Sequence, residues 1–311
     1  MLRRRRPKHA DTYGLASGGA ERHSAFRPLG VSGVGTLQTA TWLDDLRRAT
    51  DALRGKGTLA LVPTMGALHE GHLTLVREAR EHAEHVAVSI FVNPRQFGEN
   101  EDLDAYPRQM ARDTALLEEE GVALLWAPPP EEVYPAGYAT NISVAGISEG
   151  LCGSDRPGHF DGVATVVCKL FNQVRPDSAL FGEKDWQQLQ LVQAMVDRDG
   201  GPRIHAVPTS READGLARSS RNERLSQAAR RKARAVYLAL QAAAAANHPS
   251  TAEKMMREAL ESHGLEVEYA VVRSSTGLRP VDDFSRPSRA LVAAWLDGVR
   301  LIDNLPMPVW T

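Results

Sequence analysis

Two histidines three residues apart, His69 and His72, stand where an apolar run gives way to a helical pattern. The run over 59–62 is typical of a short buried strand, and the apolar spacing over 73–83 predicts an amphipathic helix. Ligands of open α/β sheets bind at the carboxyl ends of strands, and a helix N-terminus offers free N–H groups and partial positive charge to a phosphate. This stretch therefore predicts a phosphate site to which both imidazoles can donate hydrogen bonds.

Other interpretations of the histidine pair stay open from this stretch alone. Two unrelated histidines in a structural turn would give the same pattern, and a pair of histidines is also part of many metal sites. The zinc-protease motif, however, places its histidines four residues apart on one helical face, a spacing that His69 and His72 do not have.

Amide side chains follow the next predicted strand, which covers 86–92 and is almost continuously apolar, as buried parallel strands are. Asn93 and Gln96 come directly after it. Gln96 carries both a donor and an acceptor, a combination that suits a small acid bearing hydroxyl groups. A solvated glutamine in a structural turn is the alternative.

Charged residues follow a predicted strand at 178–181, where Lys184 and Asp185 begin a helix. The Lys184 ammonium can reach an anion bound at this strand end, although a solvated lysine is the ordinary alternative. A polar loop with Ser219, Ser220 and Arg221 is equally a phosphate clamp or a hinge between domains.

Arg156 stands just before a predicted helix over 159–174, and His159 begins that helix. Both side chains suit phosphate contacts, but we slightly favour a structural role in which they cap and position that helix.

The elements that position these residues alternate strand, helix, strand up to about residue 207, which predicts the α/β class, with a Rossmann-like doubly wound parallel sheet. Beyond about 210, helices over 225–246 and 250–264 precede three strand candidates, and Asp297-Gly298 is a strong hairpin signal between the last two. We expect a disordered basic tail over 1–35, a nucleotide-binding domain over 36–209 and a smaller C-terminal α+β lid domain over 210–311. Strands are predicted at 58–62, 86–92, 122–126, 141–144, 178–181, 204–207, 267–272, 290–296 and 299–302.

Composition excludes several classes of protein. The 311 residues carry a net charge of −2, which argues against a general nucleic-acid binder. The sequence has no apolar run near the roughly 20 residues that span a bilayer. Cys152 and Cys168 lack metal or redox spacing and fit a reduced cytoplasmic protein, so we expect a cytoplasmic location.

Five stretches in order resemble the pantoate–β-alanine ligase family of the nucleotidyltransferase superfamily, which carries an H-x-G-H motif. They are Pro63-Thr64-Met65-Gly66 with His69-Glu70-Gly71-His72, Phe91 to Phe97, Arg156 to Val163, Gly182 to Gln188, and Ser219-Ser220-Arg221-Asn222. The resemblance covers about 36–311. It implies ATP-dependent ligation of pantoate and β-alanine to pantothenate through a pantoyl-adenylate, with release of AMP and pyrophosphate. It also implies Mg²⁺ and a homodimer.

The resemblance assigns roles to individual residues. It implies that His69, His72, Lys184 and Arg221 are catalytic and neutralise phosphate charge, and that Gln96, Gln188 and Asn93 bind pantoate or β-alanine. Asp113 is a weak candidate for the metal, since Arg112 and Leu116 stand where other ligands would be expected. Arg218 replaces the apolar residue expected before the two serines. The implied ATP-binding residues are Met65, Gly66, His69, His72, Gly182, Lys184, Asp185, Ser210, Ser219, Ser220 and Arg221.

Two other functions remain open at this point. A simple nucleotidyltransferase would release pyrophosphate but no AMP, because its product keeps the nucleotide. A non-catalytic nucleotide-binding protein would bind ATP without pantoate-dependent exchange; the intact histidines, Lys184 and the Ser-Ser-Arg loop argue against it.

Overall fold

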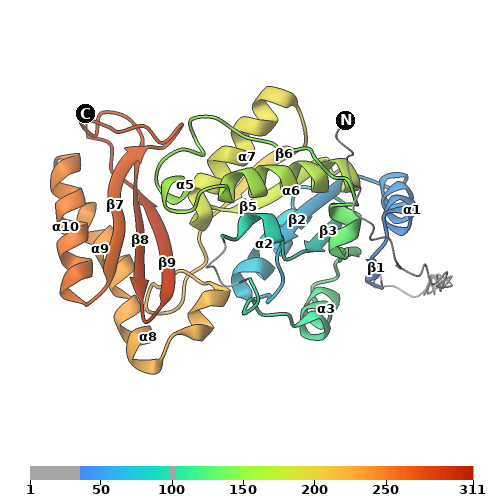
Figure 1. Cartoon of the computed structure of the whole chain (residues 1–311), viewed down its shortest axis with the longest axis horizontal. Helices are drawn as coiled ribbons and strands as arrows, with labels where there is room; N and C mark the ends of the chain where they lie inside the picture. The colour runs from blue at the N-terminus through green and yellow to red at the C-terminus, as the bar shows by residue number, and fades with distance from the viewer. Residues whose placement is uncertain (1–35, 99–102, 311) are drawn as a thin grey trace, which may run out of the picture. The chain divides into compact units, whose positions relative to one another are not determined.

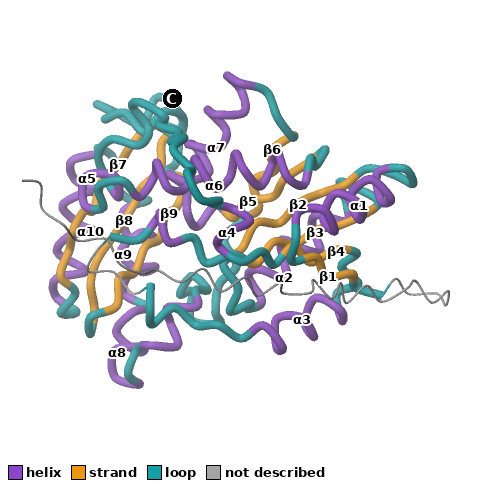
Figure 2. The backbone as a smooth tube through the Cα atoms, turned by 45° about the vertical axis from the view of Figure 1, so that its right-hand side comes forward, coloured by secondary structure: helices purple, strands orange, loops and turns teal. Residues whose placement is uncertain are grey.

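Six parallel strands form the larger of two sheets, side by side in the order β1-β4-β3-β2-β5-β6 (Figure 1, Figure 2). The computed structural model describes residues 36–98 and 103–310, so the tail predicted over 1–35 lies outside the described residues. The parallel Rossmann-like sheet predicted from the sequence is confirmed. Its strands are β1 (Gln38–Ala40), β2 (Leu59–Thr64), β3 (His85–Ile90), β4 (Leu124–Trp126), β5 (Ser178–Gly182) and β6 (Arg203–Val207).

Helices cover both faces of this sheet because successive residues of a buried strand point to opposite sides. In β2, Leu59 and Leu61 pack into one core and Ala60 and Val62 into the other. The first core is closed by α1 (Leu43–Arg54), α6 (His159–Val174) and α7 (Trp186–Asp199). The second is closed by α2 (Glu70–Arg80) and α3 (Met110–Glu119).

The order in which the chain adds strands to the sheet changes side at β2. From β2 the chain adds β3 and β4 on one side, and it later returns to add β5 and β6 on the other side, where Leu61 is paired with Ala179. In open α/β sheets the crevice for a ligand lies outside the carboxyl ends of the strands at such a switch point. The residues that follow β2 and β5 therefore lie next to each other at this crevice.

The second sheet is antiparallel and consists of β7 (Glu266–Ser274), β8 (Ser288–Leu296) and β9 (Val299–Pro306). Helices α9 (Ala235–Ala243) and α10 (Pro249–Ser262) share a separate apolar core with it. The predicted hairpin is confirmed: Asp297 and Gly298 have φ values of 51° and 71°, as a type I′ turn requires. The domain boundary at 209/210 stays a prediction, because residues 34–311 group as one compact unit.

Two predictions of secondary structure are wrong. Residues 141–144 form no strand, because the Ile142 N–H donates to Thr165 Oγ1 (2.9 Å) on α6 and not to a neighbouring strand. The long helix expected over 225–246 is interrupted at Arg234 between α8 and α9. The remaining short helical elements are η1 (Pro94–Gln96), α4 (Pro130–Val133), α5 (Cys152–Asp155), η2 (Glu183–Asp185), η3 (Ser220–Arg224) and α8 (Gln227–Ala233).

Candidate active site

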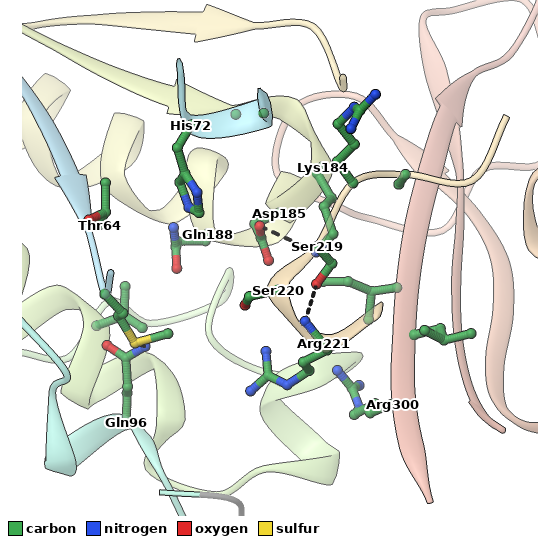
Figure 3. A pocket seen from close by; sticks show the side chains of 18 of the residues that line it. Thr64, His72, Gln96, Lys184, Asp185, Gln188, Ser219, Ser220, Arg221 and Arg300 are labelled. Carbon is green, nitrogen blue, oxygen red and sulfur yellow. Dashed lines mark hydrogen bonds and ion pairs between the residues drawn. The ribbon is translucent and has the colours of Figure 1, made fainter. Parts of the chain in front are cut away.

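A cleft of about 920 Å³ lies at the carboxyl ends of β2, β5 and β6, and strands β7 to β9 also contribute to its wall. Most of the predicted site residues line it, from segments far apart in the sequence (Figure 3). These are Met65, His69, His72, Gln96, Gly182, Lys184, Asp185, Gln188, Ser210, Ser219, Ser220 and Arg221. Gly66, Asn93 and Asp113 are not among the lining residues.

The two histidines begin α2 through their own ring nitrogens. His69 Nδ1 accepts a hydrogen bond from the Gly71 N–H (3.1 Å), and His72 Nδ1 accepts one from the His69 N–H (3.3 Å). A neutral imidazole that accepts at Nδ1 carries its proton on Nε2. Each ring is thereby set as an Nε2–H donor, and the ring centroids lie 4.1 Å apart.

Both histidines are neutral at physiological pH. Burial, and then the positive charges of Lys184 and Arg218, lower the pKa of His69 from 6.5 to about 4. Burial, and then His69 beside it, lowers the pKa of His72 from 6.5 to about 3. In the free protein the pair can donate hydrogen bonds to a phosphate but supplies no net charge. Positive charge must come from other side chains.

We expect the His72 ring not to titrate between pH 8 and pH 5.5 in the free protein, because its folded pKa lies near 3. The unfolded chain takes up a proton near pH 6.5 and the folded chain does not, so this group's contribution to stability is complete above pH 6.5 and falls as pH drops toward the folded pKa. Nuclear magnetic resonance of the Cε1–H signal, assigned by its loss in His72→Gln, measures the titration. A midpoint near 6.5 would contradict the neutral pair.

The turn before α2 is held by a buried carboxylate. Asp113 is 1% exposed, and its two oxygens accept hydrogen bonds from the N–H groups of Ala67 and Leu68, both at 2.8 Å. This geometry supports a structural role for Asp113, while its assignment as a metal ligand stays a prediction. Gly66 is buried with a φ of 80°, and an added Cβ would lie 3.1 Å from Asp113 Oδ2.

Asn93 contacts Gln96 and is not among the residues that line the cleft, and its role as a substrate ligand stays a prediction. It is 1% exposed, and its amide donates to Gln96 Oε1 (3.1 Å) and to the Gly162 carbonyl (3.0 Å). The Tyr134 hydroxyl donates to Asn93 Oδ1 (2.8 Å). Gln96 does line the cleft, and its Nε2 lies 3.1 Å from the Met65 sulfur.

Helix α6 packs directly on the turn that carries Gln96. A Cβ at Gly162 would lie 2.2 Å from the Arg95 carbonyl oxygen, so only glycine fits at this contact. Arg156 donates to the Gln96 carbonyl (3.2 Å), and His159 Nδ1 lies 2.8 Å from the same oxygen. These contacts tie the start of α6 to the turn that carries Gln96, and both side chains also line the cleft, so the choice between helix capping and phosphate contact stays a prediction.

Lys184 and Asp185 form the turn η2 after β5. Lys184 Nζ lies 3.7 Å from Asp185 Oδ2, and the lysine side chain is only 19% exposed. Gln188 follows one helical turn later, and Figure 3 shows it pointing with Asp185 toward the space that His72 faces. The switch point between β2 and β5 thus brings residues of two sequence motifs into one cleft.

The Ser-Ser-Arg loop also lines the cleft. Ser219 Oγ accepts a hydrogen bond from the Arg221 N–H (3.3 Å) and so begins η3 (Figure 3). Arg218 also lines the cleft, where it pairs with Glu212 (3.2 Å). The charge that replaces the expected apolar residue is therefore placed beside His69, whose pKa it lowers.

The part of the cleft wall that the antiparallel sheet forms was not predicted from the sequence. Arg300 and Glu268 line the cleft and form an ion pair of 2.6 Å across β9 and β7. Neither residue stands in a motif, and only the pairing of these strands places them there. A local signal for them is absent from the sequence.

Comparisons with known proteins agree with this geometry. The family model for pantoate–β-alanine ligases matches residues 38–306. A pantothenate synthetase of Novosphingobium aromaticivorans is 59% identical over 86% of this chain and 98% of that protein. One of Sphingopyxis alaskensis is 54% identical over 84% of this chain and 96% of that protein.

Solved structures give the same result. The pantothenate synthetase of Thermus thermophilus superposes with a TM-score of 0.82 at 44% identity, over 86% of this chain and 98% of that one. The pantoate–β-alanine ligase of Francisella tularensis, solved in complex with β-γ ATP and β-alanine, superposes with a TM-score of 0.75 at 32% identity, over 87% and 97% of the two chains. The chain therefore belongs to the pantoate–β-alanine ligase family, and its activity is the ATP-dependent ligation that defines this family.

Proposed function

We propose that the residues of this cleft carry out the ligation in two steps. A carboxylate is a poor acyl donor because its leaving group would be oxide. In the first step a pantoate carboxylate oxygen attacks the α-phosphorus of ATP and pyrophosphate leaves. In the second step the β-alanine amine attacks the pantoyl carbonyl and AMP leaves. The observation that carries the proposal is the convergence of His69, His72, Lys184 and Arg221 on one cleft at the switch point of the sheet.

Charge that develops on the leaving pyrophosphate is stabilised by two kinds of group. Lys184 and Arg221 supply positive charge, while the neutral rings of His69 and His72 donate from Nε2 at the N-terminus of α2. No covalent bond to the protein is needed, so positioning and electrostatic stabilisation carry the catalysis. Arg218 adds a further cation beside His69.

Pantoate is proposed to bind between Gln96 and Gln188, which both line the cleft. Because Asn93 donates to Gln96 Oε1, the amide orientation of Gln96 is fixed, and the Nε2–H that does not face the Met65 sulfur is left to meet an oxygen of the substrate. The Francisella relative, solved in complex with β-γ ATP and β-alanine, supports the proposal that this chain binds ATP and β-alanine.

Mg²⁺ is proposed to enter with the phosphates of ATP. Within residues 36–98 and 103–310 no group of three or more His, Cys, Asp or Glu side chains is arranged to hold a metal ion, and Asp113 is engaged by backbone N–H groups. Asp185 is the acidic residue of η2 that lines the cleft. One carboxylate fits an ion that keeps waters and binds mainly to substrate phosphates.

A homodimer is also proposed, on the family resemblance alone, and a cytoplasmic location is proposed from the spacing of the two cysteines. Across the part of the chain that the structure describes, no helix is long and apolar enough to cross a membrane.

Pantoate-dependent exchange of labelled pyrophosphate into ATP is expected without β-alanine, because adenylation is reversible and precedes the amine. The rate of label incorporation at saturating pantoate, ATP and magnesium measures it. β-Alanine should then release AMP in equal amount to pantothenate. No exchange under these conditions would refute the adenylate, and pyrophosphate release without AMP would favour a simple nucleotidyltransferase.

A further inference from the structure

The turn that carries Lys184 is held by the antiparallel sheet. Asn304 Nδ2, on β9, donates to the backbone carbonyls of Glu183 and Lys184, both at 2.9 Å. Arg289, on β8, donates to Glu183 Oε2 (2.6 Å) and to Asn304 Oδ1, and its guanidinium lies 3.6 Å from the Trp186 ring. Arg289 and Asn304, two side chains of the antiparallel sheet, thus hold the turn η2 that carries Lys184.

The neighbouring residue on β9 holds the Ser-Ser-Arg loop. Asp303 accepts two hydrogen bonds from Arg211, at 2.6 and 3.0 Å. Arg211 also donates to the Gly215 carbonyl (3.0 Å), and its guanidinium lies 4.4 Å from the Tyr237 ring. The loop that leads to Ser219 is therefore anchored to the same strand as the lysine turn.

The polar side chains that make these contacts from the antiparallel sheet are almost completely buried, which is unusual for charged and amide groups. Arg289, Asp303 and Asn304, here called the sheet cluster, are 6%, 3% and 2% exposed, and none of the three lines the cleft. Burial raises the pKa of the Asp303 carboxyl, and the pair with Arg211 opposes that shift. Apolar residues at such positions are often as stabilising as buried charges or more so. Because successive strand residues point to opposite sides, Asp303 and Asn304 can bind two different segments.

We propose that the sheet cluster consists of positioning residues that hold the Lys184 turn and the 211–221 loop at a fixed separation. The cluster acts on ATP binding through Lys184 and Arg221 and touches no substrate itself. The inference rests on the proposed role of Lys184 in binding phosphate. Without Asn304, two carbonyls lose their donor and the turn gains freedom that ATP must then remove, so binding weakens.

The test measures the dissociation constant of ATP for the full chain by titration calorimetry, without pantoate. Asn304→Leu keeps the side chain close to its size but removes the donor, and we expect about a tenfold weaker affinity. Ser288→Ala is the matched control, since Ser288 lies in the same sheet, is 1% exposed, and its hydroxyl has no hydrogen-bond partner among the described residues. Its affinity should be unchanged.

A double-mutant cycle with Lys184→Gln separates positioning from a general loss of structure. If Asn304 acts through Lys184, Asn304→Leu changes the affinity of the Lys184→Gln protein by less than about twofold. A second full tenfold loss in that background would overturn the proposal, as would an unchanged affinity in Asn304→Leu alone. If Lys184→Gln by itself leaves the affinity unchanged, the assignment of Lys184 fails and this inference falls with it.

Arg289→Met carries the same test if Asn304→Leu does not fold. It removes the hydrogen bonds to Glu183 and Asn304 but keeps an unbranched chain against the Trp186 ring. Its effect on ATP affinity should likewise disappear in the Lys184→Gln protein. An effect of equal size in both backgrounds would overturn the proposal.

Discussion

Lys184→Ala is expected to lower the rate of pyrophosphate exchange by about 10²–10³-fold while the fold persists. Since His69 and His72 are neutral, the positive charge that faces the leaving pyrophosphate comes from Lys184 and the arginines of the cleft. Losing a preorganised charge in a half-buried site removes stabilisation that water does not replace. Initial rates of exchange at saturating pantoate and ATP measure the effect.

The fold should survive this change because the ammonium pairs only at 3.7 Å with Asp185, and Asn304 holds the backbone of the turn through carbonyl groups that alanine keeps. Thermal unfolding of the variant should therefore match that of the parent. Lys254→Ala is the matched control, since Lys254 is 74% exposed on α10 and pairs with Glu258 within the same helix. Exchange within threefold of the parent rate in Lys184→Ala would remove Lys184 from the mechanism.

Asp113→Asn is expected to lower the free energy of unfolding by about 3 kcal/mol and to reduce exchange strongly. Both carboxylate oxygens accept buried N–H groups, from Ala67 and Leu68, and an asparagine amide can accept only one of them. The turn that loses this contact leads directly into His69. Urea unfolding gives the stability, and exchange rates give the activity.

The same variant separates the structural role of Asp113 from the metal-ligand role suggested by the sequence. If the carboxylate is structural, Asp113→Asn destabilises the protein even in buffer with EDTA and no magnesium. Asp44→Asn is the control: its carboxylate is 78% exposed on α1 in a 3.5 Å surface pair with Arg47, so a change below about 0.5 kcal/mol is expected. Full stability with a raised magnesium requirement would contradict the structural role.

Motif residues that follow strands were predictable from the sequence. The carboxyl ends of parallel strands meet at one edge, so His69 after β2, Gln96 after β3 and Lys184 after β5 had to lie near one another. The hairpin at Asp297-Gly298 was equally clear, since its residue types suit positive φ values. These conclusions needed only local patterns and the rules of parallel sheets.

Burial within a turn was not predictable. Asn93 and Gln96 stand three residues apart in the same motif, yet Gln96 faces the cleft and Asn93 is enclosed by Tyr134 and Gly162. Asp113 likewise looks like an exposed acid at the start of α3, but its partners are 45 and 46 residues away. Only tertiary packing decides such cases.

The two ring nitrogens of His69 and of His72 lie at different distances from the backbone and have different roles. The near nitrogen, Nδ1, closes the first turn of α2, and the far nitrogen, Nε2, is left for the cleft. An asparagine amide reaches about as far as the near nitrogen and a glutamine amide about as far as the distant one. Few side chains besides histidine can both accept a backbone N–H at the start of α2 and place a donor in the cleft. Helix formation and catalysis therefore both restrict the residue type at positions 69 and 72. Asparagine and glutamine variants of His69 and His72 can therefore separate the demand of the helix from that of the reaction.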